Sequence, residues 1–228
     1  MKKQTTFFTQ KRMKQLQTVV AVVCFLFMIF PLYWLFSSSL KTEASVFARP
    51  PEIFPMHPTL DAYITQLNQV TFDILGSFKN SLLISFCTMI ISVTLAIPAA
   101  YGLARFRIKG KNLIVFLFLV SQMLPQIFTL IPNFIIGIYN TYWAPILSNC
   151  TLAIPFSLMM MRAFFVGIPT EIDEAARIDG CNAFQSFIRV MLPMSANGLA
   201  VTFVFSFLFG YQDMMYSLTY VTDSAMWP

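Results

Sequence analysis

Residues 112–161 read NLIVFLFLVSQMLPQIFTLIPNFIIGIYNTYWAPILSNCTLAIPFSLMMM, fifty residues without a single Asp, Glu, Lys, Arg or His. A helix that crosses the hydrocarbon core of a membrane needs roughly 20 residues. One unbroken helix over this stretch would be about 75 Å long, far more than a bilayer holds. The stretch must therefore turn back on itself. Gly137, Asn140, Thr141 and Pro145 supply residues that are typical of such a turn.

The composition of the whole chain agrees with a membrane environment. Only 11% of the 228 residues are charged and 57% are hydrophobic, whereas an ordinary soluble domain carries about a quarter charged residues. A water-soluble fold of this size could not hide so much apolar surface, because the ratio of surface to volume falls too slowly with mass. We therefore expect an all-α polytopic membrane protein.

Apolar runs of sufficient length predict five membrane-spanning helices. Their expected limits are residues 18–39, 81–104, 113–136, 142–161 and 193–211. The first run follows basic residues, but it is too long for the apolar region of a signal peptide, so we interpret it as a retained anchor. Five spans leave the C-terminus outside, where a sixth span would begin, which indicates that the sequence is a fragment lacking its last span.

The Lys and Arg residues predict which loops face the cytoplasm. Twelve of the fifteen lie before the first predicted span, between the second and third, or between the fourth and fifth. The positive-inside rule places those segments, including the basic N-terminus 1–17, in the cytoplasm. The net charge of +5 is then an orientation signal, and we expect no nucleic-acid partner.

Two predicted loops are long. Residues 40–80 face outward, contain four prolines, and are long enough to dock a protein outside the membrane. Residues 162–192 face the cytoplasm. They predict a helix with Thr170 as its N-cap and Gly180 as its stop, followed by a second short helix from Asn182. Such a pair of helices is either a packed interfacial hairpin or an element that docks a partner.

The spacing within this cytoplasmic loop is specific. It places EAA at 174–176, glycine at 180 after three intervening residues, and VMLP at 190–193. This string resembles the EAA loop of ABC importer permeases, with Val190 where the family has isoleucine. PLYW at 31–34, AYGLARF at 100–106 and IDG at 178–180 also resemble the carbohydrate-uptake, or maltose-type, branch, and the resemblance covers essentially the whole chain.

The resemblance implies the transmembrane domain of a type I ABC importer, with the core permease domain at 81–228 and a family total of six spans. The loop would seat in a cleft of a separate ATPase subunit, which acts as a homodimer. The residues assigned to this coupling are Glu174, Ala175, Ala176, Asp179, Gly180, Leu192 and Pro193. The other implied partners are a second permease, an extracytoplasmic solute-binding protein and a sugar, all at a bacterial plasma (inner) membrane.

No catalytic, cofactor or metal site is expected in the chain itself. It contains no GxxxxGK[ST] nucleotide-binding motif, so ATP would be hydrolysed by the partner subunit. A membrane enzyme is disfavoured because the single histidine, His57, stands in the outer loop without clustered ligands. An ion-coupled secondary transporter or a channel remains the alternative, and it would be expected to carry an intramembrane acid or broken helices.

Polar residues within the predicted spans are candidates for the substrate path, since sugars need hydrogen-bonding groups. The candidates are Gln122, Asn133, Asn149 and Ser206. The alternative is that they hydrogen-bond neighbouring helices, as such residues commonly do. The predicted spans contain no charged residue, which favours a neutral solute over protons or metal ions. The sequence does not identify the solute.

Overall fold

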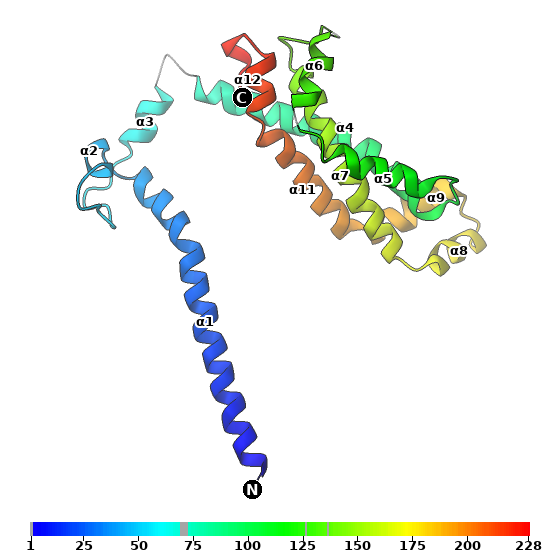
Figure 1. Ribbon diagram of the computed structural model, residues 1–228, viewed down its shortest axis with the longest axis horizontal. Coiled ribbons are helices and arrows are strands. Elements are labelled where there is room, and N and C mark those ends of the chain that lie inside the picture. Colours follow the sequence, from blue (N-terminus) through cyan, green and yellow to red (C-terminus); the bar gives the residue numbers. More distant parts are fainter. Residues whose placement is uncertain (1, 69–72, 126, 136) are drawn as a thin grey trace. The chain divides into compact units, whose positions relative to one another are not determined.

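A computed structural model describes residues 2–68, 73–125, 127–135 and 137–228, and every element in those ranges is a helix (Figure 1). The side chains of 2–12, 130, 133, 134 and 224 are outside the described part. The chain divides into two compact units, residues 1–72 and 73–228, which are treated separately below. Of the helices described, four are long and apolar enough to cross a membrane: Met13–Ser39, Ile74–Arg105, Trp143–Gly167 and Ala196–Tyr220.

The first unit begins with one long helix. Helix α1 (Lys2–Ser39) runs through the basic N-terminus and the first predicted span without a break. None of the apolar window within Met13–Ser39 is buried by the other residues of the first unit. Two short helices, α2 (Glu43–Val46) and α3 (Asp61–Leu67), follow in the predicted outer loop.

The predicted outer loop folds back onto the end of α1. The Tyr33 hydroxyl and the Ser37 hydroxyl both donate hydrogen bonds to the carbonyl of Ile53, at 2.9 and 3.1 Å. The Lys41 ammonium donates to the carbonyl of Glu52 and lies 4.7 Å from the ring centroid of Trp34. Lys41 is only 5% exposed, so its charge is satisfied by this carbonyl and by the face of the indole ring.

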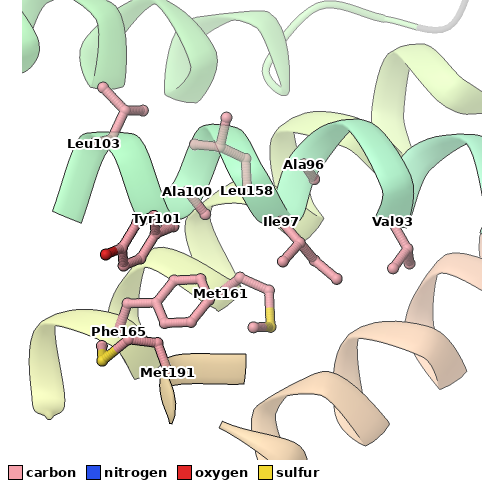
Figure 2. Packing of buried hydrophobic residues seen from close by; sticks show 10 residues of the cluster. All are labelled: Val93, Ala96, Ile97, Ala100, Tyr101, Leu103, Leu158, Met161, Phe165 and Met191. Carbon is pink, nitrogen blue, oxygen red and sulfur yellow. The ribbon is translucent and has the colours of Figure 1, made fainter. Parts of the chain in front are cut away.

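Three long helices build the second unit. Helices α4 (Ile74–Arg105), α7 (Trp143–Gly167) and α11 (Ala196–Tyr211) pack against one another along their lengths (Figure 1). Their main apolar cluster, drawn in Figure 2, brings residues of α4 together with Leu158, Met161 and Phe165 of α7. The membrane-embedded core is therefore a bundle centred on α4.

Small side chains let these helices approach closely. The buried residues of α11 are Gly198, Thr202, Ser206 and Gly210, which recur every four residues and so share one face. A Cβ atom at Gly210 would lie 2.7 Å from the Cα of Ser85 on α4. This is backbone-to-backbone packing of the kind that small residues permit between helices in membranes.

The third predicted span is wrong as a continuous helix. Residues 113–136 form α5 (Lys111–Ser121) and α6 (Ile127–Ile135), separated by a described break at 122–125. Pro125 lies at that break, and proline cannot supply the backbone N–H that a continuing helix needs. Neither helix alone reaches the roughly 20 residues that cross the hydrocarbon core.

The last apolar segment is longer than predicted and contains an acid. A short helix, α12 (Met215–Tyr220), follows α11 after a break, and the apolar stretch runs through Ala196–Tyr220. Asp213 lies at the break between α11 and α12, two residues beyond the predicted fifth span at 193–211. Its carboxylate accepts hydrogen bonds from the Tyr216 N–H and the Ser217 hydroxyl, both at 2.9 Å. The acid is satisfied locally at the start of α12.

The predicted reversal after α6 is confirmed. Gly137 and Asn140 both adopt positive φ values, 77° and 53°, before α7 begins at Trp143. The Asn140 N–H donates to the carbonyl of Tyr220 at 2.7 Å, and its side-chain oxygen accepts from the Thr222 N–H at 3.1 Å. The turn is thereby fastened to the C-terminal segment at the same end of the bundle (Figure 1).

Candidate functional site

The segment with EAA spacing lies at the opposite end of the second unit from α12 (Figure 1). Helix α7 extends to Gly167, so the predicted loop 162–192 begins inside α7. Helix α8 (Thr170–Ile178) follows almost at once. Thr170 is the first helical residue, and Pro169 occupies the N-cap position, so the predicted N-cap was one residue too late.

Gly180 ends α8 in the way that its position predicts. Its φ is +87°, in the left-handed region that glycine adopts without steric cost. The N–H of Cys181 donates to the carbonyl of Ala176 at 3.0 Å, and the N–H of Gly180 donates to Arg177 at 3.1 Å. These two bonds form the Schellman motif, which satisfies the last free carbonyls of a helix.

The second short helix starts where the sequence places it. Asn182 caps α9 (Ala183–Ser186) in a capping box, with bonds of 2.8 and 3.0 Å shared with Gln185. A turn of π-helix, η1 (Phe187–Met191), and α10 (Leu192–Met194) then lead into α11. The Leu192 side chain is partly buried and Pro193 is exposed.

Helix α8 has two distinct faces. Glu174 and Ala175 are exposed, and so are Asp179 and Gly180 just beyond the helix. Ala176 is only 6% exposed, so it packs against this chain, whereas Ala175 faces outward. These exposed residues lie at or just before the glycine turn, where another protein could contact them.

Asp173, which the sequence analysis did not select, is the buried anchor of α8. It is 5% exposed, and its Oδ2 lies 3.1 Å from Nε of Arg105, the last residue of α4. The Nε–H is not aimed at the carboxylate well enough to form a hydrogen bond, so this contact is chiefly a charge pair. The hydrogen bonds to Oδ1 come from the Ser186 hydroxyl at 2.5 Å and the Tyr101 hydroxyl at 3.3 Å.

Arg105 contacts two further groups besides the Asp173 carboxylate. Its Nη2 donates to the carbonyl of Ile168 at 2.8 Å and lies 3.9 Å from Sδ of Met191. A cation in the last turn also suits the negative end of the α4 dipole. Removing one partner from a buried ion pair typically costs about 3–5 kcal/mol, because the other charge is left uncompensated.

Aromatic rings surround this polar cluster. The Tyr101 ring lies 4.9 Å from that of Phe187 and 5.7 Å from that of Phe165, measured between centroids. Figure 2 shows Tyr101 pointing from α4 toward Phe165 and Met191. The rings shield the ion pair from water, which strengthens the attraction between its charges.

The sequence did carry a signal for the buried acid. Asp173 and Ala176 are three residues apart and share the inner face of α8. An acid on a buried face is almost never found without a partner. That argument predicts a cation near Asp173, but nothing in the spacing predicts that it is Arg105.

The three substrate-path candidates with described side chains lie at the end of α5, on α7 and on α11. Ser206 is fully buried, and its hydroxyl lies 2.7 Å from that of Ser157, a contact between α11 and α7 that fits the interhelical alternative. Asn149 is 2% exposed within α7. Gln122 is partly buried at the end of α5, and the side chain of Asn133 lies outside the described part.

Comparisons with known proteins match this architecture. A family model described as "Binding-protein-dependent transport system inner membrane component" matches residues 92–222, which include the whole coupling segment. A solved structure of a bacterial ABC transporter involved in the import of the acidic polysaccharide alginate has the same fold. It aligns with a TM-score of 0.79 and 19% identity, over 96% of this chain and 77% of that chain.

Curated relatives are similar in sequence to this chain over most of its length. The probable ABC transporter permease protein YurM of Bacillus subtilis is 34% identical over 91% of this chain and 70% of its own length. The trehalose transport system permease protein SugB of Mycobacterium tuberculosis is 31% identical over 86% and 72%. The diacetylchitobiose uptake system permease protein DasC of Streptomyces coelicolor is 30% identical over the same shares. They confirm the resemblance to carbohydrate-uptake permeases.

The chain therefore belongs to the family of binding-protein-dependent transport system inner membrane components, and it is a multi-pass inner membrane permease of the ABC transporter type.

Proposed function

We propose that this chain is one permease subunit of an ATP-driven importer that moves a sugar or a related neutral solute across the membrane. Its exposed surface at Glu174, Ala175, Asp179 and Gly180 receives a separate ATPase subunit, which acts as a homodimer. The chain has no ATPase site of its own and binds no cofactor. Leu192 and Pro193 join this surface to α11.

The observation that carries the proposal is the EAA spacing on a rigid, exposed hairpin. The glycine turn and the capping box fix its backbone, while Ala175 leaves space for close approach of a partner. A docking surface that is already ordered loses little conformational entropy when the partner binds.

Two further partners complete the proposal. A second permease packs against apolar surface of the membrane-spanning helices. A solute-binding protein delivers the sugar on the side of the ordered segment at 40–68. The trehalose and diacetylchitobiose relatives support a sugar as the solute.

The test is copurification of the ATPase subunit. The chain is co-expressed with its partner permease and ATPase, solubilised in detergent and captured. Ala175→Arg places a long charged side chain on the docking surface and should abolish capture of the ATPase. The matched control is Ala62→Arg, the same change at an exposed alanine of α3, which should leave capture unchanged. Equal capture by native and Ala175→Arg chains would contradict the docking assignment.

An ion-coupled transporter is the alternative, and it would be expected to carry an intramembrane acid. Asp213 is the acid within the apolar stretch Ala196–Tyr220. Its carboxylate, however, already accepts bonds from Tyr216 and Ser217 at the start of α12. Uptake into proteoliposomes separates the two functions. Uptake that requires ATP and ignores an imposed proton or sodium gradient supports the importer, and the reverse pattern supports the alternative.

A further inference from the structure

The inner face of α8 carries a contact that links the docking surface to the membrane core. One carboxylate, that of Asp173, receives a charge contact and a hydrogen bond from α4 and a hydrogen bond from α9. The side chains of the Asp173–Arg105 pair are 8% and 6% exposed. The cluster therefore ties three helices together at a place that solvent scarcely reaches.

The cluster faces away from the docking surface. Successive helical residues are turned by about 100° at 3.6 residues per turn, so Ala175 lies on nearly the opposite side of α8 from Asp173. Ala175 is exposed and Asp173 is buried. A displacement of α8 by a protein bound at Ala175 would be transmitted through Asp173 to Arg105.

Arg105 also prevents α8 from turning independently. Its Nη2 donates to Ile168, in the short connection before α8, while its Nε contacts the carboxylate inside α8. Rotation of α8 about its own axis would break at least one of these contacts. Since Arg105 is the last residue of α4, and α4 packs on both α7 and α11, a displacement of α8 moves the core helix with it.

We infer that Asp173 and Arg105 are positioning residues that couple α8 to α4, so that binding events at the docking surface change the conformation of the membrane bundle. Tyr101 and Ser186 support them by holding the carboxylate. This inference rests on the proposed function. These residues transmit a movement of α8 to α4 and do not themselves contact the ATPase. A ligand shifts a conformational equilibrium only when it interacts differently with its states. The cluster supplies the link by which such a difference at the docking surface reaches α4.

The experiment uses the complete importer, with both permeases, the ATPase and the solute-binding protein, in proteoliposomes. Three quantities are measured for each variant: the ATPase copurified, the rate of ATP hydrolysis and the solute transported per ATP. Asp173→Asn keeps the shape of the side chain and removes its charge. We expect unchanged copurification and a transport-to-ATP ratio lower by roughly 2- to 30-fold, the range usual for residues that modulate coupling.

Two further variants keep the result interpretable. Tyr101→Phe removes one hydroxyl donor to Asp173 and retains the ring, so it should lower the transport-to-ATP ratio less than Asp173→Asn does. If Asp173→Asn folds poorly, Tyr101→Phe alone still tests the cluster. Glu171→Gln neutralises an exposed acid in the first turn of the same helix and should leave the ratio unchanged.

The outcomes separate this inference from the proposed function. If the native chain captures no ATPase, the proposed function fails. If Asp173→Asn and Tyr101→Phe bind ATPase and transport at the native ratio, the inference fails and the proposed function stands. Loss of ATPase capture by Asp173→Asn to the level of Ala175→Arg would also overturn the inference, because the cluster would then act on docking alone.

Discussion

Gly210→Ala tests whether α11 and α4 touch through their backbones. The new Cβ would lie 2.7 Å from the Cα of Ser85, 3.3 Å from its nitrogen and 3.4 Å from the carbonyl oxygen of Ile84. Ordinary contact of a Cβ begins at 3.4 Å, so the helices would have to separate by about 0.7 Å at this point. No side-chain rotation can relieve a clash with backbone atoms.

The expected cost follows from overpacking. Inserting a methyl group into a well-packed interior typically costs about 1–3 kcal/mol. For a chain of this size, each kcal/mol lowers the melting temperature by about 2–4 °C, so the predicted decrease is roughly 2–12 °C. The measurement is thermal unfolding of the full chain in detergent, followed by far-ultraviolet circular dichroism.

Gly167→Ala is the matched control. Gly167 is the last residue of α7, and a Cβ there meets no atom within 4 Å. Replacing a glycine by alanine at a compatible position stabilises by about 0.4–1 kcal/mol through the unfolded chain. If Gly210→Ala melts at or above the temperature of Gly167→Ala, the close packing of α11 on Ser85 is refuted.

Two other substitutions give separate tests. Gly180→Asn should keep ATPase capture, whereas Gly180→Val should reduce it, because a side chain at a φ of +87° costs about 1–2 kcal/mol and asparagine tolerates this region best. Since no atom lies within 4 Å of a Cβ at Gly180, equal capture by both variants would mean that the turn does not need its left-handed geometry. Asp213→Asn should preserve ATP-driven uptake at a cost of about 1 kcal/mol in stability, because the amide oxygen can still accept the Tyr216 N–H. Complete loss of uptake by a stably folded Asp213→Asn chain would show that the charge itself is required.

The parts of the fold that depend on local chemistry could be predicted from the sequence. The reversal at 137–145 followed from Gly137 and Asn140, and both adopt the positive φ that such a turn requires. Gly180 and Asn182 likewise marked the end of one short helix and the start of the next. In each case one residue type determines the backbone, so no knowledge of distant neighbours is needed.

The break within residues 113–136 shows where this reasoning fails. Hydropathy measures whether a segment prefers lipid, and α5 and α6 are both apolar, so it does not report whether the helix continues between them. The buried face of α11 was missed for a related reason. A helix that is apolar all round gives no polar side to mark its orientation, and only the small size of Gly198 and Gly210 marks the packed face.

The anchor of the candidate site could not be predicted as a pair. Asp173 and Arg105 lie on different helices, and local spacing does not specify which distant side chain an acid will meet. In the structure the Asp173 carboxylate points inward to the end of α4.

The contact between α4 and α8 also has a consequence for how the chain is made. Tyr101 and Asp173 are separated by 72 residues, so a ribosome adding about 5–20 residues per second needs roughly 4 to 14 s to deliver the acid after the tyrosine. During that interval the carboxylate that pairs with Arg105 has not yet been synthesised. Chains released before residue 173 would therefore lack the buried ion pair that joins α8 to α4.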